Sequence, residues 1–482
     1  MPMPPESSSS ASPSSSSPPS VAASVSASGP LPVFPPGFLW GASASAFQTE
    51  GAADADGKGP SGWDAFAAAG RVRGGADAAR GTGFYHRYRE DVALLAGLGV
   101  DAFRFSVSWP RVVPGGTGPV NPHGLDFYDR LVDELCAHGI TPAPTLYHWD
   151  TPLPLDEAGG WLNRDTAQRF ADYAAVVAER LADRVPLWMT LNEPAEVTLL
   201  GYALGEHAPG QKLLFDALPA AHHQLLAHGL AARALRAAGA GRVGIAVSHS
   251  PVRAAGDTEE DRFAAGLYDT LTNHLFADPL LTGAYPDESI AALMPGPVAE
   301  DLALIAQPLD FYGVNYYHPM LVGAPHPAAP DALDSFGGVG MPEGLPFGLR
   351  DIPGTERTAF GWPVVPEGLR ELLLLLKERY GDRLPPVLIT ENGCSYEGVD
   401  DPRRIAFLDG HLRALHAAIT EGVDVRGYFT WSLTDNIEWA EGAAQRFGLV
   451  HIDYETLART PKASYGWYRD AIAAQRAAHG AG

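Results

Sequence analysis

Short apolar runs alternate along the chain with longer segments in which apolar and polar positions are mixed. The runs are five to seven residues long and predict β-strands, because they are too short for helices. We expect strands at residues 38–43, 102–107, 142–148, 187–193, 243–248, 311–317, 387–391 and 427–432. The longer amphipathic segments predict helices at residues 85–98, 124–138, 164–182, 217–238, 367–379 and 403–421.

Eight strands separated by helices indicate a fold class. Parallel strands need long crossover connections, which helices provide, and eight such units close into a (β/α)8 barrel. We therefore predict an α/β fold built as a single TIM barrel with elaborated βα loops. Residues 257–308 have helical character and residues 320–362 are rich in glycine and proline. Both segments are too long for simple crossovers, so we expect them to form loops that wall a pocket.

Residues 1–30 differ from the rest of the chain in composition. They are almost entirely serine, proline and alanine, and Glu6 is their only charged residue. Such a segment cannot bury enough apolar surface to offset the entropy of ordering it. It also lacks the basic start and apolar stretch of a secretory signal. We predict a disordered tail at 1–30, with an unconventional targeting role as the alternative, followed by a catalytic barrel domain at 31–482.

The charge balance of the chain restricts its partners. The chain has 57 acidic and 34 basic residues and a formal net charge of −23. A field of this sign repels nucleic acid and anionic lipid, so the expected partner is a small neutral molecule, although the same excess also serves solubility. The longest aliphatic run, residues 372–376, is far shorter than the roughly 20 residues of a membrane span.

The chain has only two cysteines, Cys136 and Cys394. This number favours a reducing compartment, so we expect a cytoplasmic protein. Cys394 follows Glu391 closely, and a catalytic thiol is therefore an alternative to consider. A buried bystander is favoured, because no separate thiol motif surrounds Cys394.

Polar and aromatic residues gather where the predicted strands end. In a parallel barrel these ends meet at one face, where the functional site of such folds lies. The residues are Gln48, Arg104, His148, Trp149, Asn192, Glu193, Asn315, Tyr317, Glu391, Trp431, Glu438 and Trp439. One such residue alone is weak evidence, but together they predict a site.

Glu193 and Glu391 each follow an apolar strand directly. Hydrolysis of a glycosidic bond needs a proton donor and an anionic group that face an oxocarbenium-like centre. Arg104 would favour the charged form of a nearby carboxyl, and Tyr317 could donate a second hydrogen bond to the same carboxylate. We interpret the two glutamates as a candidate catalytic pair. The alternative is a pair of solvated acids at loop edges, which is ordinary in so acidic a chain.

The remaining strand-end residues suit a sugar. Vicinal hydroxyls need polar groups, supplied here by Gln48, His148, Asn192 and Glu438, and the C–H face of the ring needs an aromatic surface such as Trp431 or Trp439. Metal binding by His148 is a poor alternative, because no second histidine stands at ligand spacing. The adjacent residues His222 and His223 face different sides of a helix. We therefore expect no metal.

These motifs resemble those of glycoside hydrolase family 1, the β-glucosidase and β-galactosidase family. The resemblance runs in order from about Phe34 to Tyr468. The matching segments are residues 38–52 (FLWGASASAFQTEGA), 103–109 (FRFSVSW), 147–150 (YHWD), 190–194 (TLNEP), 389–393 (ITENG) and 431–439 (WSLTDNIEW).

The resemblance implies a retaining, two-step mechanism without a cofactor. Glu391 would be the nucleophile and Glu193 the acid/base, with their carboxyl groups about 5–5.5 Å apart. Burial and the Glu391 anion should raise the pKa of Glu193, so that it starts protonated. The implied sugar-binding residues are Gln48, His148, Asn192, Tyr317, Glu391, Trp431, Glu438 and Trp439. The activity implied is that of a β-glucosidase acting on terminal non-reducing β-D-glucosyl residues of oligosaccharides or of aryl and alkyl glycosides.

Several positions refine this expectation. Glu438, Gln445 and Phe447 stand where phosphoglycosidases of the family typically carry Ser, Lys and Tyr, so a sugar phosphate is disfavoured. Thioglucosidases replace the acid/base with Gln, whereas Glu193 is retained, which favours O-glycosides. Ala443 and Ala195-Glu196 depart from the family pattern on the aglycone side, where we also place Trp362.

Three alternative functions remain open at this point. A transglycosylating β-glycosidase would pass the glycosyl group to an alcohol or a sugar rather than to water. β-Galactosidase or β-fucosidase could be the main activity. A noncatalytic sugar-binding barrel is the alternative from another class.

Overall fold

A computed structural model describes residues 29–75, 79–326, 335–336, 339–340, 342 and 344–480. Nearly all of the tail predicted at 1–30 lies outside the described residues, which begin at Gly29. No helix in the described part of the chain is long and apolar enough to cross a membrane.

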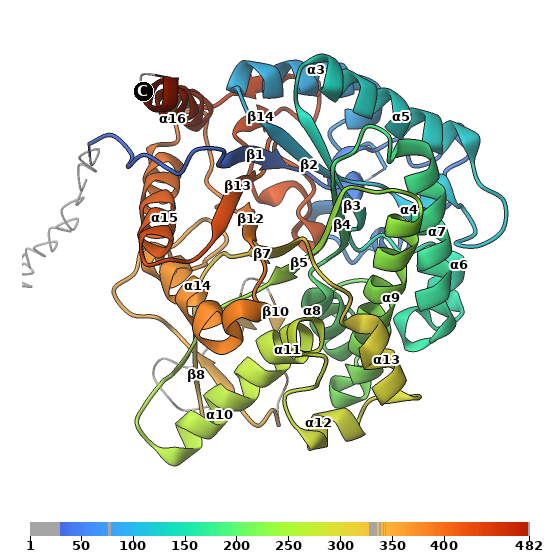
Figure 1. Cartoon of the computed structure of the whole chain (residues 1–482), viewed down its shortest axis with the longest axis vertical. Helices are drawn as coiled ribbons and strands as arrows, with labels where there is room; N and C mark the ends of the chain where they lie inside the picture. Colours follow the sequence, from blue (N-terminus) through green and yellow to red (C-terminus); the bar gives the residue numbers. More distant parts are fainter. Residues whose placement is uncertain are drawn as a thin grey trace, which may run out of the picture.

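Eight parallel strands close into a barrel in the middle of the molecule (Figure 1). This confirms the predicted TIM barrel. The order around the barrel is β1-β13-β12-β7-β5-β4-β3-β2. The strands are β1 (Leu39–Ser43), β2 (Ala102–Ser106), β3 (Thr141–Tyr147), β4 (Leu187–Asn192), β5 (Arg242–Ser248), β7 (Phe311–Asn315), β12 (Val387–Asn392) and β13 (Val425–Trp431). All eight predicted strands overlap these within three residues at each end.

Helices surround the barrel and cover the outer faces of the strands (Figure 1). The six predicted helices are α3 (Phe84–Leu98), α5 (Pro122–Ala137), α7 (Asp165–Leu181), α9 (Leu218–Ala237), α14 (Pro366–Tyr380) and α15 (Pro402–Thr420). Four of them, α5, α9, α14 and α15, have a proline at the first or second position, where the missing N–H has no intrahelical partner to lose. The C-terminal helix α16 (Ala463–Gly480) was not among the predicted helices.

The two long insertions lie between barrel strands and have different structures. The first contains the predicted helices, here α10 (Glu259–Asp269), α11 (Leu275–Thr282), α12 (Glu288–Ala292) and α13 (Val298–Ile305). The second contributes short strands, and β8 (Met320–Gly323) pairs with β6 (Val252–Ala254) and β11 (Gly348–Arg350) in a small side sheet. The second insertion therefore carries local β-structure that its glycine and proline content did not reveal.

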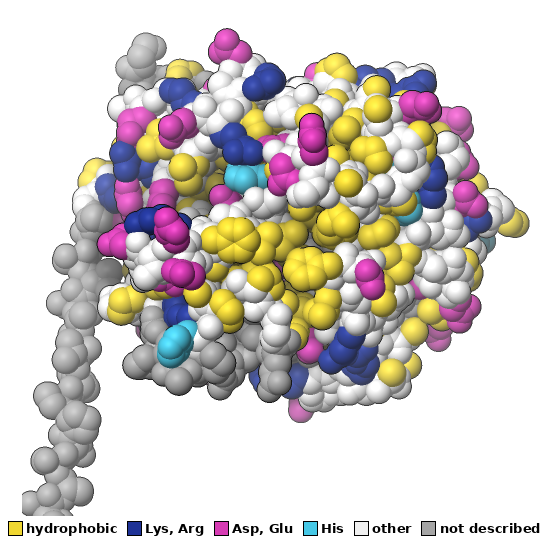
Figure 2. Space-filling model, turned by 90° about the horizontal axis from the view of Figure 1, so that it is seen from below, with side chains coloured by type: hydrophobic (Ala, Val, Ile, Leu, Met, Phe, Trp, Pro, Cys, Tyr) yellow, Lys and Arg dark blue, Asp and Glu magenta, His cyan; other side chains and the backbone are white. Residues whose placement is uncertain are grey.

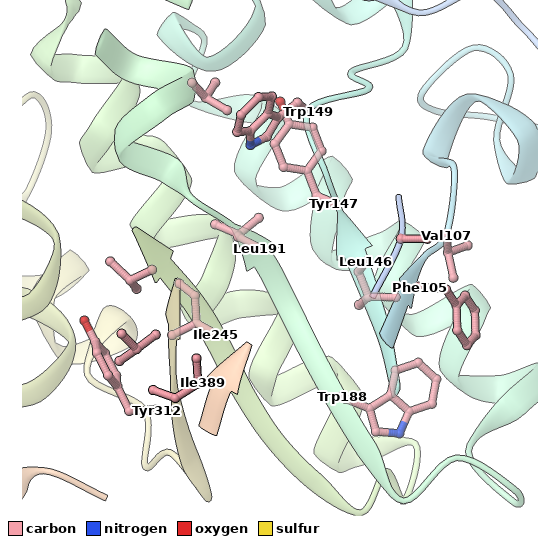
Figure 3. Close-up of a cluster of buried hydrophobic side chains, with 14 of the residues drawn as sticks. Phe105, Val107, Leu146, Tyr147, Trp149, Trp188, Leu191, Ile245, Tyr312 and Ile389 are labelled. Atoms are coloured by element: carbon pink, nitrogen blue, oxygen red, sulfur yellow. The ribbon is translucent and has the colours of Figure 1, made fainter. Parts of the chain in front are cut away.

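Alternate strand residues divide the core into two parts. A large cluster packs between strands and helices, and Figure 3 shows members such as Trp188, Leu191 and Ile245. A smaller cluster contains strand residues alone. We call it the apolar plug; its members are Ala102, Ala143, Leu187, Met189, Phe311, Leu388 and Phe429. Because these residues stand in the first half of most of their strands, the plug fills the end of the barrel opposite the strand C-termini.

Candidate active site

The strands change from apolar to polar residues as they approach their C-terminal ends. In β4 and β12 the register with a neighbouring strand shifts just before each glutamate, between Met189 and Asn192 and between Ile389 and Glu391. Such an irregularity re-aims the side chain that follows it, and it occurs often beside active sites. Glu193 then leaves the strand with φ of +47°, a left-handed conformation that costs a non-glycine residue about 1–2 kcal/mol. Two strands are thus locally distorted where the two candidate glutamates stand.

Glu391 is 3% exposed and has two strong donors. Arg104 Nη1 donates to its Oε1 at 2.5 Å, and Tyr317 Oη donates to its Oε2 at 2.8 Å. Both contacts stabilise the anion, as the sequence predicted for Arg104 and Tyr317. Burial raises the pKa of Glu391, while Arg104 and Tyr317 act in the opposite direction.

Glu193 is 6% exposed and lacks a cationic partner among the described residues that hydrogen-bond to it. Asn315 Nδ2 donates to its Oε1 at 2.8 Å. Burial first, then the charges of Glu391 and Glu196, raise the pKa of Glu193 well above its ordinary value. Glu391 is therefore the carboxyl that ionises first, and Glu193 is the one that keeps its proton.

A chain of hydrogen bonds joins the floor of the site. Arg104 Nη2 donates to Asn192 Oδ1 at 2.6 Å, and Asn192 Nδ2 donates to His148 Nε2 at 3.0 Å. Burial and the nearby Arg104 lower the pKa of His148 well below its usual range, so the ring is neutral. Asn315 Nδ2 also donates to Asn192 Oδ1, at 3.0 Å. Asn192 thus links the partners of both glutamates.

Glu438 supplies a third carboxyl to the site. Gln48 Nε2 donates to its Oε2 at 3.1 Å, and Ser45 Oγ donates to Gln48 Oε1 at 2.6 Å. Burial and the charge of Glu391 raise the pKa of Glu438 to about 8.

A cavity of about 330 Å³ opens over these groups, a size typical of small-molecule sites. Its lining includes eight predicted residues: His148, Glu193, Tyr317, Trp362, Glu391, Trp431, Glu438 and Trp439. Gln48, Arg104 and Asn192 are not among the lining residues and support the site from behind through the contacts above. The lining described by the structure includes no lysine or arginine.

Aromatic rings form one side of the cavity. Trp431 and Trp439 both stack near His148, with centroids 5.7 and 5.8 Å from its ring. Trp149 lies 4.3 Å from Trp439 and donates its indole N–H to the Asn192 carbonyl at 3.0 Å. The sequence placed Trp149 at a strand end without a role, and Asn315 likewise. Position at a strand end was the signal for both.

A second part of the cavity is apolar, and the two long insertions wall part of it, as the sequence predicted, although the sequence did not show which of their residues face the cavity. Six apolar residues of the loop segments line it, and we call them the outer wall: Leu199, Leu200, Leu214, Phe215, Leu271 and Phe347. They come from η4 (Val197–Ala203), η5 (Leu214–Ala217), η6 (Thr270–His274) and the residue before β11. An apolar loop residue has no sequence signal that separates it from a core residue.

The two alternatives to a pair of catalytic glutamates, a cysteine thiol and a metal, find no support in the described lining of this cavity. Cys394 is buried, does not line the cavity, and burial raises the pKa of its thiol to about 12, as expected of a bystander. Among the described residues, no group of three or more His, Cys, Asp or Glu side chains could hold a metal ion.

The sequence and the fold can be compared with those of known proteins. The sequence profile of glycosyl hydrolase family 1 matches residues 32–477. The chain belongs to glycosyl hydrolase family 1. This confirms the resemblance drawn from the motifs, which also covered nearly the whole described chain.

Two similar family 1 proteins and one solved structure are named as β-glucosidases. Thermostable β-glucosidase B of Thermobispora bispora is 46% identical over 94% of this chain and 93% of its own length. A bifunctional β-D-glucosidase/β-D-fucosidase of Bifidobacterium breve is 41% identical over 92% of this chain and 98% of its own. The crystal structure of a psychrophilic β-glucosidase from Micrococcus antarcticus superposes with a TM-score of 0.87 at 46% identity and covers 92% of this chain and 98% of that one.

Proposed function

We propose that this family 1 chain is a retaining β-glucosidase that hydrolyses terminal non-reducing β-D-glucosyl residues. One observation carries the proposal. Two buried carboxyl groups line one cavity, and Arg104 contacts only one of them, Glu391. The names of the family 1 relatives support glucose as the sugar.

In the first step, Glu391 is the nucleophile and Glu193 the general acid. An oxygen of Glu391 forms a bond to the anomeric carbon while the bond from that carbon to the leaving oxygen breaks. Glu193 gives its proton to the leaving oxygen, so an alcohol or sugar departs. The opposed environments of the two carboxyls favour this assignment, because the group beside Arg104 ionises first.

In the second step, the charge distribution reverses. Once Glu391 is esterified, its negative charge no longer raises the pKa of Glu193, which is now a carboxylate. Glu193 takes a proton from water, the water oxygen bonds to the anomeric carbon, and the ester bond to Glu391 breaks. Two displacements at one carbon release β-glucose.

The remaining polar groups hold the sugar. His148 and Glu438 offer donors and acceptors to hydroxyl groups, while Asn192 and Gln48 hold these two side chains in place from behind. Trp431 and Trp439 offer aromatic faces to the C–H side of the ring. The described part of the lining has no lysine or arginine, which favours a neutral sugar over a sugar phosphate.

The test is turnover of a nitrophenyl β-glucoside, followed by proton NMR during the first minutes. We expect chromophore release, with β-glucose as the first-formed anomer. First-formed α-glucose would contradict retention, and no turnover of any β-glycoside would favour the noncatalytic sugar-binding barrel.

A second activity has specific support. The Bifidobacterium breve relative is named for both β-glucosidase and β-fucosidase activity. A panel of gluco-, galacto-, fuco- and manno-configured β-glycosides ranks these activities here. Adding alcohols to the assay distinguishes a hydrolase from a transglycosylating enzyme, because an acceptor would replace water as the product-forming nucleophile.

We also propose a cytoplasmic location and no nucleic-acid partner. Two free cysteines, Cys136 and Cys394, support the first, and a net charge of −23 supports the second. Cell fractionation and a nucleic-acid binding assay at low salt test them.

A further inference from the structure

Thr390 is a polar residue that a bound sugar does not touch. It precedes Glu391 in β12, is fully buried, and is not among the lining residues of the cavity. It therefore belongs neither to the sugar site nor to the molecular surface, one face of which Figure 2 shows. A hydroxyl group in such a place costs free energy unless it is hydrogen-bonded, so its partner indicates what it does.

The hydroxyl group of Thr390 holds the amide that contacts Glu193. Thr390 Oγ1 donates to Asn315 Oδ1 at 2.6 Å. Asn315 Nδ2 donates in turn to Glu193 Oε1 at 2.8 Å and to Asn192 Oδ1 at 3.0 Å. The Asn315 amide thus has its oxygen on Thr390 and its nitrogen on the candidate acid.

Arg104 fixes the direction of these hydrogen bonds. An arginine side chain only donates, and Arg104 Nη2 donates to Asn192 Oδ1 at 2.6 Å. The Asn192 atom that meets Asn315 is therefore an acceptor, and Asn315 has to face it with an N–H group. Of the residues that the structure describes, Thr390 is the one that donates to the Asn315 oxygen on the other side. Without this donor a buried oxygen would be left unpaired.

An irregularity of β12 brings the Thr390 side chain to this position. Between two successive pairs with β7, β12 has one residue more than β7, and Thr390 is the extra residue. Adjacent side chains of a regular strand point to opposite faces, whereas the extra residue lets Thr390 and Glu391 both reach groups around the site. The methyl group of Thr390 lies beside Gly313, where a Cβ atom would stand only 2.9 Å from it. Gly313 therefore leaves room for the methyl group while the hydroxyl group meets Asn315.

We propose that Thr390 is a positioning residue for the acid/base: its hydroxyl group holds the Asn315 amide with the N–H group aimed at Glu193. The inference rests on the proposed function for the role of Glu193. Glu193 becomes a carboxylate when it gives its proton to the leaving oxygen, and a donor already in place stabilises that charge without reorganisation. Thr390 also joins the supports of both glutamates, because its backbone carbonyl accepts from Arg104 Nη1 at 3.1 Å, the atom that donates to Glu391.

The protonation of Glu193 reports on this contact. Burial first, then the charges of Glu391 and Glu196, raise the pKa of Glu193. The N–H group of Asn315 and the charge of Arg104 lower the same pKa. A weaker contact with Asn315 should therefore raise the pKa further, so that Glu193 keeps its proton to higher pH.

The first test measures this protonation without substrate. Thr390→Val keeps the branched shape and removes the hydroxyl group, so the midpoint of the Glu193 titration should move about 0.3 to 1 pH unit higher. Carbon-13 NMR of the full chain, labelled at the glutamate carboxyl carbon, follows the titration. The Glu193 signal is the one that is absent from Glu193→Gln. A midpoint that stays in place in Thr390→Val would overturn the inference.

Two further variants serve as controls. Thr390→Ser keeps the hydroxyl group and should restore the midpoint. Thr190→Val makes the same change in β4, where Thr190 is equally buried but its hydroxyl group pairs with His228 Nδ1 at 2.6 Å, and should leave the midpoint unchanged. An equal shift in Thr190→Val would contradict the assignment. If Thr390→Val does not fold, Thr390→Ala is compared with Thr390→Ser, since those two differ only in the hydroxyl group.

Turnover gives a second readout. In Thr390→Val, kcat/KM for cellobiose should fall about 3- to 30-fold, through kcat rather than KM, because the lost contact stabilises charge that forms during the reaction. The fall for a nitrophenyl β-glucoside should be much smaller, since its leaving group needs little protonation. Equal falls with the two substrates, or a rise in KM alone, would contradict a role through Glu193. Absence of turnover in the unaltered chain would count against the proposed function, whereas the NMR titration would still decide whether Thr390 acts on Glu193.

Discussion

The proposed sugar site and the outer wall are parts of one cavity but are built in opposite ways. The sugar site stands on barrel strands and is held by charge-assisted hydrogen bonds such as Arg104 to Glu391 at 2.5 Å. The outer wall stands on loop segments, and two of its residues are more than 40% exposed. Strands fix reacting groups firmly, whereas loops can change without disturbing them. The chemical step and the choice of leaving group should therefore respond to different mutations.

The largest effect is expected at the nucleophile. Glu391→Ala removes the group that forms the covalent intermediate, so kcat/KM should fall by about 10⁴-fold or more for every β-glucoside, whatever its aglycone. Nitrophenyl β-glucoside and cellobiose assays measure this. Glu441→Ala is the control, because Glu441 lines the cavity but pairs with Arg73 at the surface. Turnover that survives in Glu391→Ala would refute the nucleophile assignment.

The acid should show a smaller loss that depends on the leaving group. Glu193→Ala should reduce kcat/KM for cellobiose by about 10²- to 10⁴-fold, because an alkoxide leaves poorly without a proton. Nitrophenolate needs little protonation, so the loss of kcat/KM for a nitrophenyl glucoside should be much smaller. Equal losses with the two substrates would count against Glu193 as the acid.

Glu438→Gln tests whether the sugar site alone selects the sugar. Loss of a charge-assisted hydrogen bond to a hydroxyl should lower kcat/KM by about 10- to 100-fold. The ratio of gluco- to galacto-configured activity should change, while the relative rates of different aglycones stay the same. A change in aglycone preference would show that the two parts of the cavity are coupled.

The smallest effect concerns the pH profile. Activity needs Glu391 ionised and Glu193 protonated, so kcat/KM should fall as the pH drops through the pKa of Glu391 and as it rises through that of Glu193. The groups that face Glu193 are Glu391, Glu196, Arg104 and Asn315. Glu196→Gln removes one negative charge that raises the pKa of Glu193.

The basic limb of the Glu196→Gln profile should therefore move to lower pH. We expect the maximum of kcat/KM to change by no more than about threefold, because Glu196 does not act on the reacting atoms. A profile of kcat/KM against pH for the two proteins measures this. Ser248→Ala serves as the matched control, because it removes the hydrogen bond to Glu196 without removing a charge. A basic limb that stays in place would contradict the electrostatic role of Glu196.

The sequence predicted the barrel, and the gathering of polar residues at the strand ends, better than the rest. A parallel strand buried on both faces appears as a short apolar run, and the polar residue that ends it is conspicuous, as at Glu193 and Glu391. The ends of the strands were less accurate. The prediction extended β4 to residue 193, but the left-handed backbone of Glu193 ends that strand at Asn192.

The insertions that carry Leu271 and Phe347 were predicted to wall a pocket, but the individual residues of the outer wall could not be predicted, for a physical reason. Leu199 and Leu200 follow Glu193 in an apolar stretch that has the same composition as a buried helix. Only the path of the loops shows that these side chains face a cavity. Likewise, the pKa of Glu391 depends on the burial of its carboxyl group as well as on Arg104, and a sequence motif does not reveal how deeply a side chain is buried.

The apolar plug has a consequence for the order in which molecules leave. It fills the barrel at the start of the strands, so the proposed sugar site lies at the blind end of the cavity. Everything that enters or departs must pass the loop segments at the open end. The alcohol set free in the first displacement therefore has to clear the passage before water can reach the ester. A slowly dissociating alcohol would delay the second displacement, and glucose would be the last product out.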